Sequence, residues 1–210
     1  MVPENLFQRY EALVKKADRS FQRMEKDYGD CITCQIHCSD CCHAIFGLFL
    51  VEAAFIQRQF DGLGRIERRA ALLRANKADR ELKKIEVKLQ RYKGDPQMTA
   101  LTLARERVRC PLLDEKEECI LYPHRPITCR VYGIPTAVHK KAHVCGKAAF
   151  EPGKTYPIFD LDAAYRDLYQ LSREILLQRR VQQVEKASLL LSVSKVIKTP
   201  FEDILQGDFG

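Results

Sequence analysis

The chain has 210 residues, of which 46% are hydrophobic, and a formal net charge of +7, so it can bury a core and disorder is not expected. The first residues lack a basic start followed by an apolar block, and the longest apolar run, 44–51, is about half of what a membrane span requires. We therefore expect neither a secretory signal nor a transmembrane helix, and we expect a cytoplasmic location.

Helical periodicity covers most of the sequence. Residues from Pro3 to about Lys26 form the first predicted helix, because apolar side chains recur there at intervals of three and four. A second helix is predicted from Leu48 to Phe60, directly after a group of cysteines, and the glycines at 62 and 64 end it. No alternating pattern is long enough to predict a strand. The expected fold class is mainly α.

A strongly basic helix is predicted from Arg65 to Lys93. This segment contains eleven Lys or Arg and four Asp or Glu, a net charge of +7, whereas the rest of the chain has 24 of each and is formally neutral. Its apolar positions are spaced by four and three: Ala78, Leu82, Ile85, Leu89 and Tyr92. Such spacing is typical of a long helix packed against another helix. We expect Pro96 to end it and the segment to form a hairpin or arm.

The last long helix is predicted from Leu161 to about Val196. We therefore expect a single domain over residues 1–210, with a helical insertion at about 61–106 and a C-terminal helix at about 160–197. Irregular loops rich in cysteine should lie between the helices and form a metal site.

Five cysteines occur within twelve residues before the second predicted helix: Cys31, Cys34, Cys38, Cys41 and Cys42. A reducing compartment keeps disulfides open and favours metal binding or redox chemistry for so dense a pattern. The chain has nine cysteines, an odd number that complete disulfide pairing could not use. The Cys-x2-Cys spacing at 31/34 and 38/41 lets two sulfurs reach one metal. For any single cysteine, the ordinary alternative is a small buried side chain.

The second cysteine region covers residues 110–135. It contains Cys110, Cys119 and Cys129. Prolines and a glycine exclude a continuous helix there, so the region is predicted to be a folded loop that presents thiols. Cys145 follows it. His139 and His143 precede Cys145 beside two lysines, and we treat them as exposed residues held in reserve as ligands.

Thiolates are soft ligands, and sulfur-rich tetrahedral sites are typical of zinc or iron–sulfur centres. With four ligands per metal, nine thiolates suffice for two sites, or for one four-iron cluster with extra ligands. The adjacent side chains of Cys41 and Cys42 diverge, which favours two metals or two irons of one cluster. A purely structural role for one of them is the alternative. If the second region folds back over the first, metal binding contributes to folding.

These motifs together resemble the YkgJ-like cysteine-cluster family, the CxxCxxCC zinc- or iron-chelating domain. That family's signature is C-x2-C-x2-C-C, then C-P, then C-x-I-Y with R-P and C-R. The matching residues here are Cys38, Cys41, Cys42, Cys110, Pro111, Cys119, Tyr122, Arg125, Pro126, Cys129 and Arg130. Family spacing would put the first cysteine at Gln35, whereas this chain has Cys34 and an added Cys31. The sequence leaves open which of these two takes the family role.

The resemblance implies a metal-binding protein that chelates zinc or iron, with an iron–sulfur cluster among the candidates. The candidate ligands are Cys31, Cys34, Cys38, Cys41, Cys42, Cys110, Cys119, Cys129 and Cys145. Arg125 and Arg130 would donate hydrogen bonds that offset thiolate charge. A turn stabiliser and a surface charge are the alternative roles for these two arginines.

Two alternative functions remain at this point. Some flagellin lysine methylases share a related cysteine pattern, so an iron–sulfur enzyme or redox subunit resembling a protein N-methylase is one of them. No phosphate loop, zinc-protease motif or serine–acid constellation marks an enzyme, however. The other is a nucleic-acid-binding protein that uses the basic helix over 65–93, but a solvated basic face is the commoner explanation and Tyr92 is the only aromatic residue in that helix. An unknown protein partner could also use this helix. We expect no membrane contact.

Overall fold

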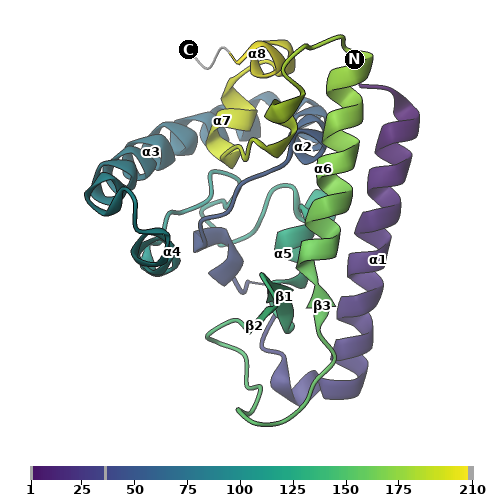
Figure 1. Cartoon of the computed structure of the whole chain (residues 1–210), viewed down its shortest axis with the longest axis vertical. Helices are drawn as coiled ribbons and strands as arrows, with labels where there is room; N and C mark the ends of the chain where they lie inside the picture. Colours follow the sequence, from purple (N-terminus) through teal and green to yellow (C-terminus); the bar gives the residue numbers. More distant parts are fainter. Residues whose placement is uncertain (1, 36, 208–210) are drawn as a thin grey trace.

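The computed structural model describes residues 2–35 and 37–207, and it confirms a mainly helical fold. The α-helices are α1 (Glu4–Tyr28), α2 (Leu50–Asp61), α3 (Arg65–Leu89), α4 (Pro96–Arg105), α5 (Ile127–Val131), α6 (Leu161–Gln178), α7 (Val193–Lys198) and α8 (Phe201–Gln206). The 3₁₀ turns are Gly29–Cys31, Asp40–His43, Gln90–Tyr92, Tyr122–His124 and Val184–Ser188, and the strands are β1 (Thr136–Val138), β2 (Lys141–His143) and β3 (Phe159–Asp160). In Figure 1, α1 and α6 lie side by side, and α3 projects on the opposite side of the molecule.

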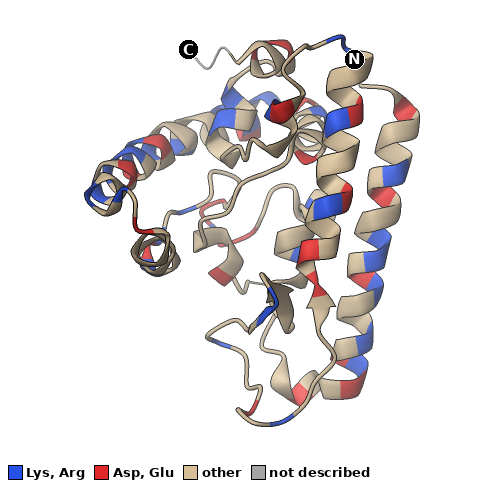
Figure 2. Ribbon diagram, viewed as in Figure 1, with Lys and Arg blue, Asp and Glu red and all other residues tan. Residues whose placement is uncertain are grey.

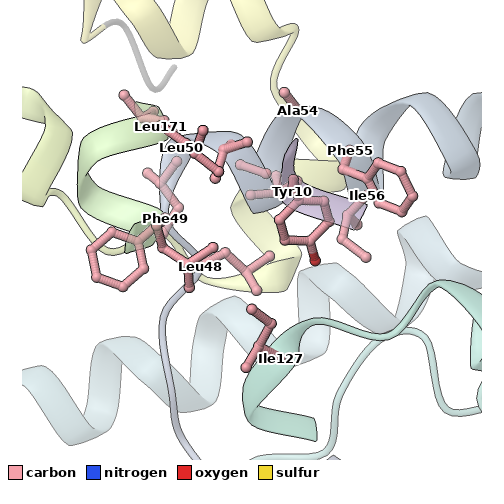
Figure 3. Packing of buried hydrophobic residues seen from close by; sticks show 14 of the residues in the cluster. Tyr10, Leu48, Phe49, Leu50, Ala54, Phe55, Ile56, Ile127 and Leu171 are labelled. Carbon is pink, nitrogen blue, oxygen red and sulfur yellow. The ribbon is translucent and has the colours of Figure 1, made fainter. Parts of the chain in front are cut away.

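The main core lies where α1, α2 and α6 meet. The apolar face predicted for the first helix is buried, and Leu6, Tyr10 and Ala17 have no exposed surface. The rings of Tyr10 and Phe55 pack with their centroids 5.0 Å apart, inside the cluster that Figure 3 shows. The helix expected over 48–60 begins two residues later, at Leu50, because the residues before it are extended.

The extended segment before α2 is paired with the C-terminal part of the chain. Leu48 and Leu191 form an isolated antiparallel bridge, with N···O distances of 2.8 and 2.9 Å. The two segments approach so closely that a Cβ atom at Gly47 would lie 2.4 Å from the Cβ of Leu190. Glycine is therefore required at this crossing. The pairing therefore joins the segment that follows the first cysteine cluster to the segment that precedes α7.

The predicted basic helix is present as α3, and Figure 2 shows Lys and Arg distributed along it. It packs against α7 and α4, as expected for a helical arm. Ala71 and Ala75 have no exposed surface and belong to the main core. Pro96, which was predicted to end the basic segment, also begins the next helix, because it lies in the first turn of α4. There Asp95 caps the helix by accepting the N–H of Met98 at 2.9 Å.

The single C-terminal helix expected up to about Val196 is interrupted. α6 ends at Gln178, where Arg180 adopts a left-handed conformation with φ 55°. The N–H of Val181 donates to the carbonyl of Leu176 and that of Arg180 to Leu177, at 2.9 and 3.0 Å. This is a Schellman ending. Such endings most often place glycine at the left-handed residue, and because this one has Arg180 there, no glycine in the sequence predicts where the helix ends. A new helix, α7, starts only after Ser192, whose hydroxyl accepts the N–H of Lys195.

A small sheet is present that the pattern analysis did not predict. Its strand order is β2-β1-β3, with β1 antiparallel to β2 and parallel to β3. The strands have two or three residues each, too few for a visible alternation. His139 and Lys140 form the β1–β2 turn with φ of 51° and 61°, so they shape a hairpin.

Candidate metal centre

In the first cysteine cluster, Cys31 ends one 3₁₀ turn, Gly29–Cys31, and a second 3₁₀ turn, Asp40–His43, carries Cys41 and Cys42. The second turn is held by Cys42 N–H to the Ser39 carbonyl at 2.9 Å and by Ala44 N–H to the Cys41 carbonyl at 3.3 Å. Successive residues of a 3₁₀ turn point about 120° apart. The two adjacent thiols therefore face different directions from one short element.

Backbone pairing places the second cysteine region against this turn. The N–H of Cys110 donates to the Cys42 carbonyl at 2.7 Å, and that of Val108 donates to the His43 carbonyl at 3.0 Å. A tight loop then returns the chain, because Leu113 and Cys119 form an antiparallel bridge. Cys129 follows on α5, which packs against α1.

Cys41 lies at the centre of the gathered thiols. It borders an inner cavity of about 20 Å³ and two outer cavities of about 290 and 350 Å³. The inner cavity is lined by Cys41, Cys42, Cys110, Cys119 and Cys129, together with Arg125 and apolar side chains. Cys38 faces both outer cavities, and Cys34 faces the larger one. Candidate ligands from both motifs therefore meet in one region.

The thiols around Cys41 perturb one another's pKa. Hydrogen bonds from the thiols of Cys129 and Cys42 lower the pKa of Cys41 to about 3, and the positive charge of Arg125 adds to this effect. The same hydrogen bonds, followed by burial, raise the pKa of Cys42 and of Cys129 above the usual thiol value. The arrangement is a thiolate at Cys41 that accepts from two thiol donors.

Burial also raises the pKa of three other gathered thiols. Burial is the largest cause that raises the pKa of Cys110 and of Cys34 to about 12, and it also raises the pKa of Cys119. Metal binding at these sulfurs must therefore displace protons, as it does at any thiol ligand.

Arg125 and Arg130 have different surroundings. The Arg125 guanidinium lies 3.7 Å above the Tyr122 ring and lines all three cavities that Cys41 borders. Arg130 is directed to oxygen atoms: it forms two 2.9 Å bonds to Asp18 of α1, and it donates to the carbonyls of Arg125 and Pro123. Arg130 therefore fastens the second cysteine region to α1.

Two candidate cysteines do not line the three cavities that Cys41 borders. The Cys31 residue lies outside these cavities, and its carbonyl accepts the N–H of Ala149 at 2.9 Å. Cys145 is buried, with its sulfur 3.5 Å from an Asp40 carboxylate oxygen. Cys145 and the reserve residue His143 line another cavity, of about 460 Å³.

Cys34 is placed by a close contact with the second cysteine region. A Cβ atom at Gly133 would lie 2.3 Å from the Cys34 sulfur, so the chain passes directly over this thiol. The sequence left open whether Cys31 or Cys34 takes the family role. In the structure, Cys34 borders the larger outer cavity together with Cys38, and Cys31 does not.

Several residues at the outer cavities were not predicted. His37 borders the smaller cavity and lies 3.5 Å from Glu118, and Asp18 and Glu25 of α1 border the larger one. His37 sits within the cysteine motif and could have been noticed there. The α1 residues carry no such signal, because the folding of α1 against the loops brings them to the site.

The donor chemistry fits a soft metal, although the side chains do not form a closed coordination shell. Within residues 2–35 and 37–207, no group of three or more Cys, His, Asp or Glu side chains is placed to hold an ion as it stands. All nine cysteines are free thiols, and five of them surround one enclosed space that is large enough for a water-sized body.

Comparison with known families agrees with this chemistry. A family model described as "CxxCxxCC: Putative zinc- or iron-chelating domain" matches residues 30–146, more than half of the chain and a range that contains every cysteine. Neither the curated proteins nor the solved structures gave a match. Helices long and apolar enough to cross a bilayer are absent from the part of the chain that the structure describes.

Proposed function

This chain belongs to the CxxCxxCC family of zinc- or iron-chelating domains, and on that premise we propose that it binds its metal through the thiolates gathered around Cys41. The observation that carries the proposal is the inner cavity, where Cys41 and Cys42 of the first motif face three cysteines of the second. Sulfur donors of this kind select zinc or iron over hard cations. The metal would supply a link between two regions of the chain that are distant in sequence.

Closing the coordination shell requires side-chain rotation, for which the cavity leaves room, and loss of protons, which burial opposes and the bound metal must drive. The inner cavity leaves space between the sulfurs, and the backbone pairing of Cys110 with Cys42 keeps the two motifs in place during such a rotation. The guanidinium of Arg125 would offset part of the negative charge that accumulates on the thiolates. Arg130 would act indirectly, by positioning Arg125 and the loop.

Metal analysis of serine variants tests the proposal. The protein is purified without oxygen, and its zinc, iron and acid-labile sulfide are measured beside a melting curve. Cys41→Ser and Cys129→Ser should lose metal and thermal stability together, because a structural zinc site contributes on the order of 10 kcal/mol. Cys31→Ser is the matched control and should keep both. If Cys41→Ser and Cys129→Ser retain full metal content, the proposal is wrong.

An iron–sulfur enzyme or redox subunit is the alternative function. The larger outer cavity, of about 350 Å³, gives a substrate-sized space that reaches Cys41 from solvent, and this observation favours it. A brown protein with acid-labile sulfide would support this alternative, whereas a colourless protein with stoichiometric zinc would support metal binding alone. The free state of all nine thiols is consistent with a reducing, cytoplasmic environment.

The domain organisation expected from the sequence also remains a proposal. The main core includes Val2 near one end and Leu205 near the other, which supports one domain over residues 1–210. Ala78 and Ile85 of α3 form a small separate cluster with Val108, which supports an insertion at about 61–106.

We also infer that the outer face of α3 binds an acidic, amphipathic helix of a partner protein. Ile66, Leu73 and Val87 are 85%, 65% and 56% exposed, and they fall on one seven-residue repeat whose third position is Arg80. Aliphatic side chains make no favourable contact with a phosphate backbone, and this stripe is too narrow to insert into a bilayer. The apolar seam of a second helix would pack against it.

Peptide binding tests this surface. A synthetic helical peptide with leucine at every seventh position and flanking glutamates should bind, and binding should weaken in Leu73→Asp and with rising salt. Tighter binding to a DNA duplex or to anionic vesicles, or no binding of the peptide, would contradict the inference.

A further inference from the structure

We infer that the thiols form two unlike metal positions that share Cys41: an inner position that retains its metal and an outer position that exchanges it. The inference rests on the proposed function, and it adds that zinc or iron at the outer position exchanges with the surrounding solution. The separate cavities on either side of Cys41 carry it.

The inner position is the more enclosed of the two, although Cys42 and Cys119 also border the smaller outer cavity. Besides the five cysteines, its walls are mainly apolar and include Leu48, Ile56 and Leu121, each at most 2% exposed. Leu48 is tied to Leu191, so opening this wall separates the C-terminal segment from the core. More packed side chains cover a metal bound here, so we expect it to leave more slowly than one at the outer position.

The outer position faces solvent on two sides. Cys34 and Cys38 interact through a thiol–thiol hydrogen bond, and both border the larger outer cavity. Cys38 also borders the smaller one. Neither of these two cysteines borders the inner cavity, whereas Cys41 borders all three. A metal held by Cys34, Cys38 and Cys41 could be reached by an incoming thiol or chelator without unfolding.

The mouths of the outer cavities carry charge that suits a cation. Glu117 and Glu118 border the smaller cavity, and Asp18 and Glu25 border the larger one. Arg125 also borders both cavities and Arg130 the larger one, while Asp18 is paired with Arg130 and Glu117 with Arg109. Carboxylates at the entrance raise the local concentration of metal ions, and soft sulfurs inside then bind them.

Release kinetics separate the two positions. The full-length protein is loaded anaerobically with Zn²⁺, and zinc release to the chromogenic chelator 4-(2-pyridylazo)resorcinol is followed. We expect about two zinc ions released in two phases, the slow phase at least about tenfold slower than the fast one, a difference of about 1.4 kcal/mol in activation free energy. Cys34→Ser combined with Cys38→Ser should abolish the fast phase and leave the slow one. Cys31→Ser should leave both phases.

Alkylation mapping tests the same point without variants that could fail to fold. At one equivalent of Zn²⁺, Cys42 and Cys110 should be protected from an alkylating reagent while Cys34 and Cys38 react. At two equivalents all four should be protected. Release of zinc in a single phase, or equal protection of the four cysteines at one equivalent, would overturn the two-position inference but leave metal binding intact. Neither zinc nor iron bound to the wild-type protein would instead overturn the proposed function.

Discussion

A buried carboxylate, Glu52, joins the start of α2 to the start of α5. The residue is 2% exposed, and its two carboxylate oxygens accept the N–H of Phe49 at 3.3 Å and that of Ile127 at 3.1 Å. Burial raises the pKa of Glu52 from 4.5 to about 7, against the opposing effect of the two N–H donors. Because α5 carries Cys129, this carboxylate helps to hold the second cysteine region against the core.

The raised pKa predicts a definite pH dependence. An acid with a higher pKa in the folded state binds more protons when folded, so the free energy of unfolding falls as pH rises from the unfolded pKa to the folded one. The difference between 4.5 and about 7 corresponds to roughly 3 kcal/mol, at about 1.4 kcal/mol per pKa unit. This stability should be fully present below about pH 4.5 and lost above about pH 7.

The assay is urea unfolding of the wild type and of Glu52→Gln at several pH values with the same metal content. Glutamine does not titrate, so the difference between the two proteins isolates Glu52 from the cysteines. Its amide oxygen can accept one of the two N–H groups, and the other group, left unsatisfied, costs about 1–3 kcal/mol. The wild type should therefore be more stable near pH 5, and its advantage should shrink by roughly 2–3 kcal/mol by about pH 8. An advantage that stays constant or grows with pH would refute the reasoning.

Three further predictions concern positions that the fold depends on. Arg130→Ala should lower the free energy of unfolding by roughly 2–3 kcal/mol, and a double-mutant cycle with Asp18→Ala should show coupling; additive effects would contradict the ion pair. Gly133→Ala should cost roughly 1–3 kcal/mol in a melting experiment, because the methyl group would lie 2.3 Å from the Cys34 sulfur, and an unchanged melting temperature would argue against this contact. Arg180→Gly should raise the urea midpoint by an amount equal to about 1 kcal/mol, since Arg180 has φ 55°, and no gain would show that the arginine side chain compensates for the strain.

Long helices and the family signature could be read from the sequence. The helix predicted over 3–26 and the basic helix predicted over 65–93 agree with α1 and α3, because their apolar residues recur with the helical period and their faces are buried as that period requires. The family was recognised from Cys38, Cys41 and Cys42 with the second motif, and the family model confirms it.

Chain reversals in the C-terminal half could not be read in the same way. α6 ends on an arginine in the left-handed conformation, and the strands are too short for periodicity. Leu191, in the segment between α6 and α7, pairs with Leu48, which lies far away in sequence. Tertiary contacts therefore override local preference in this part of the chain.

The sequence by itself determined the chemistry of the candidate site: nine soft donors at metal-binding spacings, free in a chain that is mainly helical. Only the tertiary structure decided which of them meet. It gathers Cys34 rather than Cys31 beside Cys38, because the chain crosses the Cys34 sulfur at Gly133, and it turns Cys145 towards Asp40. Spacing limits which sulfurs can reach one another along the chain, but their convergence depends on how α1, α2 and α5 pack, and that packing is set by contacts between residues distant in sequence.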